Sequence, residues 1–72
     1  MPKIPLWNYK KVVKTLESFG YDIVRQKGSH IRLSHPDKDS VTVPAHNLVA
    51  RGTLRKILRD ANISVEEFTD EE

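Results

Sequence analysis

The sequence contains no cysteine among its 72 residues. It therefore has no means of forming a disulfide or a zinc site built on thiolates, and this absence fits a cytoplasmic protein. Long apolar runs are also missing, since no stretch approaches the roughly 20 apolar residues of a membrane span. The first residues, 1–5, lack the apolar run of a signal peptide. We expect one small cytoplasmic domain over residues 1–72, with a body of about 6–64, an acidic segment at 65–72 and no membrane contact.

The net charge of +2 conceals an uneven distribution of charge along the chain. Residues 64–72 carry five acidic side chains and no basic one, so residues 1–63 carry a net charge of +7. A basic body is typical of a protein that binds a polyanion, most simply RNA or DNA. The alternative is a solvated charged surface with a solubilising tail. The division also suggests that the acidic segment folds back over the basic face, in which case deleting residues 69–72 would change RNA affinity at low salt.

Apolar residues at helical spacing predict a first helix that starts after residue 8. Its apolar stripe consists of Tyr9, Val12, Val13, Leu16 and Phe19. Asn8 is the expected N-cap, and Trp7 is expected to pack onto Val12 one turn further on. Gly20 is expected to end the helix in the left-handed conformation.

Three short strands are predicted to follow this helix. Residues 21–26 and 31–35 flank the turn at Lys27-Gly28-Ser29-His30, where a glycine is free to adopt positive φ. Residues 35–40 are expected to form a loop, because Pro36 bars continued strand pairing. Residues 41–43 then form a third strand, which Pro44 ends.

A second helix is predicted from a stripe of Leu54, Ile57, Leu58 and Ala61. Its other positions hold the basic residues Arg51, Arg55, Lys56 and Arg59. Asn62 is expected to end it, with Ile63 as the hydrophobic contact of the C-cap. Residues 64–67 form a capping box that opens a last short segment, which Val65 and Phe68 hold in place before the chain frays.

The order helix, three antiparallel strands, helix predicts an α+β fold in which both helices cover one face of the sheet. The other face stays open and is the candidate functional surface. If Ile31 and Leu33 point to the core, alternation places His30 and Arg32 on that open face. A second place suited to phosphate lies at Gly52-Thr53, near the start of the second helix.

Four blocks of sequence, in a fixed order over about residues 8–64, carry a family resemblance. They are Gly20-Tyr21, Arg25-Gln26-Lys27-Gly28-Ser29-His30, Val43-Pro44-Ala45-His46, and Gly52-Thr53-Leu54-Arg55 with Ile57-Leu58. The chain resembles the HicA toxin family of bacterial toxin–antitoxin pairs. The resemblance implies a fold similar to the double-stranded-RNA-binding domain and a ribosome-independent endoribonuclease that acts on mRNA. It also implies that His30 is the catalytic residue and that a HicB-type antitoxin blocks the active surface.

Cleavage of RNA needs a group that takes the proton of the 2′-OH, a group that protonates the leaving 5′-oxygen, and positive charge near the phosphate. Histidine suits proton transfer because its unperturbed pKa, about 6.5, lies near working pH. His30 is therefore the candidate general base or general acid, and Lys27 and Arg32 are candidates for stabilising charge on the phosphate. Ser29 either bonds a phosphate oxygen or completes the turn. The RNA-binding residues that we expect are Lys27, Gly28, Ser29, Arg32, Arg51, Thr53 and Arg55.

We expect no metal and no cofactor, because three scattered histidines without cysteine or paired acids do not make a ligand set. His35 is expected only to end its strand, whereas His46 either takes part in the chemistry, caps the second helix or braces the hairpin. The toxin alone is expected to be a monomer. Two other functions compete with the nuclease. One is a non-catalytic RNA-binding module that uses the basic side chains of the second helix, and the other is a protein-interaction domain without RNA affinity.

Overall fold

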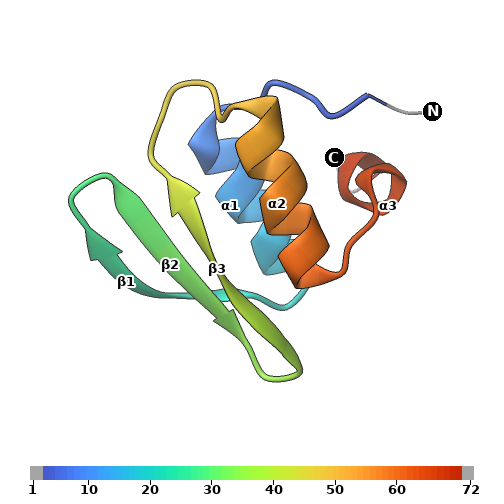
Figure 1. Cartoon of the computed structure of the whole chain (residues 1–72). Coiled ribbons are helices and arrows are strands. Elements are labelled where there is room, and N and C mark those ends of the chain that lie inside the picture. The colour runs from blue at the N-terminus through green and yellow to red at the C-terminus, as the bar shows by residue number, and fades with distance from the viewer. Residues whose placement is uncertain (1–2, 71–72) are drawn as a thin grey trace.

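The computed structural model describes residues 3–70, so the ends of the predicted lead-in and of the acidic segment lie outside the described residues. The elements are α1 (Tyr9–Ser18), β1 (Asp22–Lys27), β2 (His30–His35), β3 (Lys38–Pro44), α2 (Arg51–Ala61) and α3 (Val65–Asp70). The strands form one antiparallel sheet in the order β1-β2-β3. Figure 1 shows α1 and α2 on the same side of the sheet. The predicted α+β arrangement is thus confirmed.

The core lies between the sheet and the two longer helices. On β2, Ile31 and Leu33 are buried while His30 and Arg32 are exposed, so the predicted alternation is confirmed. The buried side chains that meet them come from α1, β3 and α2: Val12, Leu16, Val41, Val43, Leu54, Ile57 and Leu58. Because these side chains fill one face, the other face of the sheet is left to solvent.

The helix ends follow the local signals in the sequence. The side chain of Asn8 accepts a hydrogen bond from the backbone N–H of Lys10 at 2.8 Å, as an N-cap does. Gly20 has φ of +97° and follows Phe19, the C-cap of α1, whereas Asn62 has φ of +56° and is itself the C-cap of α2. The N–H of Ile63 then donates to the carbonyl of Leu58 at 2.9 Å, which completes the C-cap of α2.

The segment predicted as a loop over residues 35–40 is mostly strand. β3 begins at Lys38, which pairs with His35 across a turn of two residues, Pro36 and Asp37. Pro36 lies inside the turn, where its lack of an N–H removes no ladder hydrogen bond. The proline therefore marks the turn between two strands, and the prediction of a longer loop was wrong.

The first strand contains a β-bulge between Ile23 and Arg25. Ile23 pairs with Leu33 and Arg25 pairs with Arg32, so Val24 is the extra residue. Simple alternation from Ile23 would turn Arg25 toward the helix side of the sheet. The extra residue reverses this, because directly paired residues share a face. Every β1 residue after the bulge changes face in the same way.

The helix α3 packs, through Phe68, on the lead-in and on the C-cap residue of α1. Its capping box is formed as predicted: the Oγ atom of Ser64 accepts from the N–H of Glu67 at 3.1 Å, and the Glu67 carboxylate accepts from the N–H of Ser64 at 3.3 Å. Phe68 is fully buried and stacks on Trp7, with ring centroids 5.4 Å apart, and on Phe19 at 6.3 Å. The helix continues to Asp70, beyond the point where fraying was expected.

The position of α3 bears on the acidic segment. Figure 1 shows α3 on the side of α2 away from the sheet. Glu66 and Glu67, in its first turn, are therefore remote from the open sheet face. No helix within residues 3–70 has both the length and the apolar character needed to cross a membrane.

Candidate functional site

The open face of the sheet carries two rows of side chains that run across the strands. One row is Lys27, His30 and Pro44, and the other is Arg25, Arg32 and Thr42. The Nη1 atom of Arg32 donates to the Oγ1 atom of Thr42 at 3.1 Å, which orients the guanidinium along the second row. The imidazole of His30 therefore has a lysine directly across from it and an arginine two positions along its own strand.

A tight turn fixes the pair of Lys27 and His30. Gly28 occupies the first central position with φ of +58°, a conformation that glycine adopts without steric cost, and this is the pattern of a type II′ hairpin turn. The backbone carbonyl of Ser29 accepts a hydrogen bond from the N–H of Ala45 at 2.6 Å. The turn is thereby tied to the segment after β3, so His30 stands on a supported strand end.

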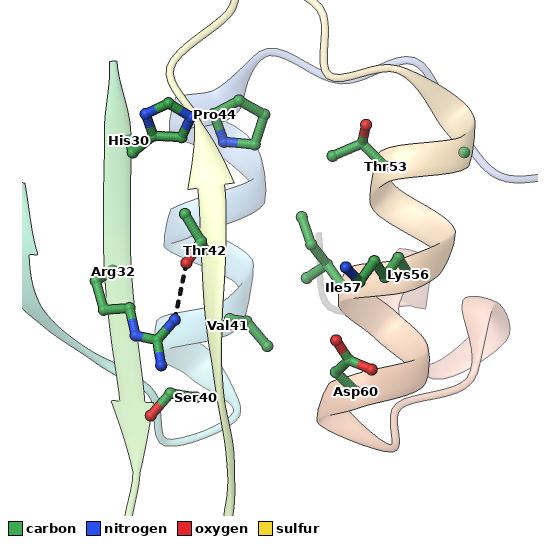
Figure 2. Close-up of a pocket in the computed structure, with 11 residues that line it drawn as sticks. His30, Arg32, Ser40, Val41, Thr42, Pro44, Thr53, Lys56, Ile57 and Asp60 are labelled. Atoms are coloured by element: carbon green, nitrogen blue, oxygen red, sulfur yellow. Dashed lines mark hydrogen bonds between the residues drawn. The ribbon is translucent and has the colours of Figure 1, made fainter. Parts of the chain in front are cut away.

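Two hollows meet at His30. The first lies on the sheet face, has a volume of about 360 Å³ and is lined by Arg25, Lys27, His30, Arg32 and Thr42. The second lies between β3 and α2 and has a volume of about 520 Å³; Figure 2 shows its lining residues. His30, Arg32 and Thr42 border both hollows. Since the lining of the first hollow contains three permanent or near-permanent cations and no acid, it is suited to an anion.

The helix α2 supplies the far wall of the second hollow. Thr53, Lys56 and Asp60 line it, and Figure 2 shows all three on the side of α2 that faces β3. Their spacing of three and four residues places them along one helix face. At the start of α2, the N-cap residue Ala50 provides no side-chain hydrogen bond, and Gly52 also lines the hollow.

The structure brings together some of the predicted site residues and not others. His30, Lys27, Arg32 and Thr53 all line one or both hollows. Gly28 and Ser29 form the adjoining turn without lining either hollow, and Arg51 and Arg55 also lie outside both. The Nε atom of Arg51 donates to the carbonyl of Ile4 at 2.9 Å, so this arginine ties the lead-in to the start of α2.

Several lining residues were missed by reasoning from sequence. Arg25 was not included because the bulge that turns it onto the open face does not follow from simple alternation. Ser40 belongs to the segment taken for a loop, and Thr42 was assigned no role. Lys56 and Asp60 lie on a helix whose orientation toward β3 is a tertiary property. The spacing of Thr53, Lys56 and Asp60 was the available signal that they share a face.

The three histidines have different environments. The His30 side chain is exposed and makes no hydrogen bond or ion pair with any other residue of 3–70. His46 is also exposed but lines neither hollow; its carbonyl accepts from the N–H of Tyr9 at 3.2 Å. Within the described part of the chain, no group of three or more histidines, cysteines or acids is placed to hold a metal.

The third histidine, His35, does more than end its strand. Its Nδ1 atom accepts from the N–H of Asp37 at 2.9 Å, and its Nε2 atom lies 3.1 Å from the carbonyl of Phe19. The neutral tautomer with hydrogen on Nε2 satisfies both contacts. The ring also packs on Tyr21, with centroids 5.1 Å apart. His35 thus connects the end of β2 to the segment between α1 and β1.

These features define a class: a small α+β domain of α-β-β-β-α order whose open sheet face is cationic and centred on a histidine. The family model for the HicA toxin of bacterial toxin–antitoxin systems matches residues 9–63. The chain belongs to the HicA toxin family, as its four sequence blocks indicated, and it has the role of a toxin with a cognate antitoxin as its partner. No curated protein matches the chain.

Proposed function

We propose that this toxin is an endoribonuclease that cleaves mRNA in the cytoplasm without the ribosome, and that His30 transfers a proton in the reaction. The proposal is supported above all by the position of His30. Its side chain is exposed, has no partner within residues 3–70, and borders the two hollows on which four cationic side chains converge: Arg25, Lys27, Arg32 and Lys56.

The arrangement of charge favours a polyanionic substrate. Arg25 lies directly opposite Arg32 on one face of an antiparallel pair. Like charges in this position destabilise a sheet. Phosphate groups that bind between them would neutralise the repulsion. The pair is therefore suited to a surface that binds a polyanionic ligand.

In the proposed reaction, the 2′-oxygen of the RNA attacks the adjacent phosphorus. The bond from phosphorus to the 2′-oxygen forms, the bond to the 5′-oxygen breaks, and the products end in a 2′,3′-cyclic phosphate and a 5′-OH. His30 either takes the 2′ proton or delivers a proton to the 5′-oxygen, which contributes about 10²- to 10⁴-fold. Lys27 and Arg32, on either side of His30, stabilise the negative charge that develops on the phosphoryl oxygens.

The test uses purified protein and a long, labelled single-stranded RNA without ribosomes. Wild type is compared with His30→Ala and with His46→Ala, a matched loss of an exposed histidine outside the hollows. We expect wild type and His46→Ala to cut the RNA, and His30→Ala to lose at least about 100-fold in rate while its circular dichroism spectrum is unchanged. The cut ends should carry a 2′,3′-cyclic phosphate, and DNA of the same sequence should stay intact.

Other outcomes identify the competing functions. RNA binding without cleavage would indicate a non-catalytic RNA-binding module, and the absence of RNA affinity at low salt would indicate a protein-interaction domain. Equal cutting by wild type and His30→Ala would remove His30 from the mechanism. A module that binds RNA through the basic residues of α2 is less well supported. Arg51 donates a hydrogen bond to the carbonyl of Ile4, and neither Arg51 nor Arg55 lines either hollow.

The same surface accounts for control by the antitoxin. A HicB-type antitoxin that covers the open sheet face would exclude mRNA from His30, so binding of the partner and of RNA would compete. The toxin alone is expected to act as a monomer. Both statements are checked by size-exclusion chromatography with light scattering, and by RNA competition with the purified complex.

A further inference from the structure

We propose that Asp60 reads a base of the bound RNA, and that the hollow between β3 and α2 favours a base with an exocyclic amino group over uracil. The inference rests on the proposed function and goes beyond it by naming a specificity-determining residue. Among the described residues that line this hollow, Asp60 is the only acidic one. Figure 2 shows it on the same side of α2 as Lys56, facing β3.

Charge changes sign along the hollow. Its cationic part contains Arg32 and Lys56, and the start of α2 at Gly52 and Thr53 borders it as well. Asp60 lies seven residues after Thr53, which is about 10 Å along the helix axis. Phosphates are attracted to the cationic part and repelled by the carboxylate of Asp60. The part of a nucleotide that extends toward Asp60 is therefore its uncharged base.

An ionised carboxylate only accepts hydrogen bonds, so the group that it contacts must be a donor. Cytosine, adenine and guanine each present an exocyclic amino group at the edge that proteins read in single-stranded RNA. Uracil has no amino group, and its one N–H lies between two carbonyl oxygens that a carboxylate repels.

The surroundings of Asp60 leave its carboxylate available to a ligand. Its contact with the Nε atom of Arg59 is 3.7 Å long, and the two side chains are 39% and 73% exposed, so this pair holds the carboxylate only weakly. The hydroxyl of Tyr21, which lies in its neighbourhood, already donates to the carbonyl of Asp39 at 2.8 Å.

The proposal is tested with a pool of single-stranded RNA that is randomised around the cleaved position, followed by sequencing of the products. We expect wild type to cleave RNAs with uracil at one position next to the cut about tenfold less often than RNAs with any other base there. Asp60→Asn should lose this discrimination, because its amide can also donate to uracil. Asp60→Ala should lose it as well. Glu66→Gln, the same chemical change on α3, should keep the wild-type profile.

The outcomes separate this proposal from the nuclease itself. If wild type cuts RNA but shows no position that disfavours uracil, or if both Asp60 variants keep the wild-type profile, the role of Asp60 is overturned and the nuclease stands. If wild type does not cut RNA, the affinities for oligocytidine and oligouridine are compared instead, with the same variants. Equal affinities, or no binding at all, would then overturn the role of Asp60 together with the nuclease.

Discussion

Arg25 and Arg32 are direct partners across the β1–β2 ladder and share the open face of the sheet. Their charges repel each other in the free protein and converge on the same hollow. If the proposed function holds, this pair lowers the stability of the free protein and strengthens its binding to RNA.

Replacing one member of the pair should separate these two effects. We expect Arg25→Thr to raise the free energy of unfolding by about 0.2–1 kcal/mol, because it removes a like-charge cross-strand pair, and to weaken RNA binding. Urea unfolding and RNA titration measure the two effects. Gln26→Thr, on the same strand but the opposite face, controls for the preference of threonine for strands. If Arg25→Thr lowered the free energy of unfolding and Gln26→Thr did not, repulsion between Arg25 and Arg32 would not destabilise the folded protein.

Salt dependence should report which cations contact phosphate. For single-stranded nucleic acid, the logarithm of the binding constant falls with the logarithm of salt concentration by about 0.7 for each phosphate neutralised. Lys56→Ala should therefore make the slope shallower by about 0.7. Lys10→Ala removes an exposed lysine of α1 that lines neither hollow and should leave the slope unchanged. Identical slopes for wild type and Lys56→Ala would place Lys56 outside the RNA contact.

Gly20 should tolerate no side chain. A Cβ atom at this position would lie 2.9 Å from the Nε2 atom of His35, and φ at Gly20 is +97°. We expect Gly20→Ala to lower the free energy of unfolding by about 1–3 kcal/mol, through backbone strain and the collision with the imidazole. Thermal and urea denaturation would measure the loss.

The matched control is Gly28→Ala, where φ is +58° but no atom lies within 4 Å of the added carbon. It isolates the cost of the backbone conformation. Combining Gly20→Ala with His35→Ala removes the collision, so the double variant should lose less stability than the two single losses added together. Strict additivity would mean that the imidazole moves aside at no cost.

Stability should fall at alkaline pH because of Tyr21. Burial raises the pKa of Tyr21 above 10.0, and the nearby carboxylates of Asp39 and Asp60 raise it further. The folded state thus holds the phenolic proton more tightly than the unfolded state, so the stabilisation is complete below pH 10 and is lost as pH rises through the higher folded pKa. Tyr21→Phe should cost about 1 kcal/mol near neutral pH, from the lost hydrogen bond to Asp39.

The measurement is urea unfolding of wild type and Tyr21→Phe between pH 8 and pH 11.5. The difference in stability between the two proteins should shrink above about pH 10. Effects of lysine titration are common to both proteins and cancel in the difference. A difference that stays constant over this range would contradict the assignment.

Local signals in the sequence predicted the helices well. Asn8, Gly20 and Asn62 act within one turn of their own helix, so their roles can be inferred without knowledge of the rest of the fold. The turn at Gly28 and the alternation of Ile31 and Leu33 are local in the same sense. These features were sufficient to predict the α+β arrangement and the open face that carries His30.

The remaining parts of the site depend on relationships between elements. The start of β3 was missed because Pro36 was taken to end strand pairing, whereas it forms a two-residue turn between paired strands. Arg25 reaches the open face through a bulge that only the ladder with β2 defines. Lys56 and Asp60 line the second hollow because α2 packs beside β3, and no short window of sequence encodes this packing.

The bulge in β1 decides which face of the sheet the cations of this strand occupy. Val24 contributes no charge and is exposed, and the bulge that leaves it unpaired keeps Arg25 and Lys27 on the open face. A ladder without the bulge, in which Val24 paired with Arg32, would keep all the cations of the strand and turn Arg25 and Lys27 to the helix side of the sheet. Deleting Val24 would instead remove the extra residue and leave Arg25 opposite Arg32. The face that each cation of β1 occupies therefore depends on how the strand pairs with β2, which the composition of the strand does not show.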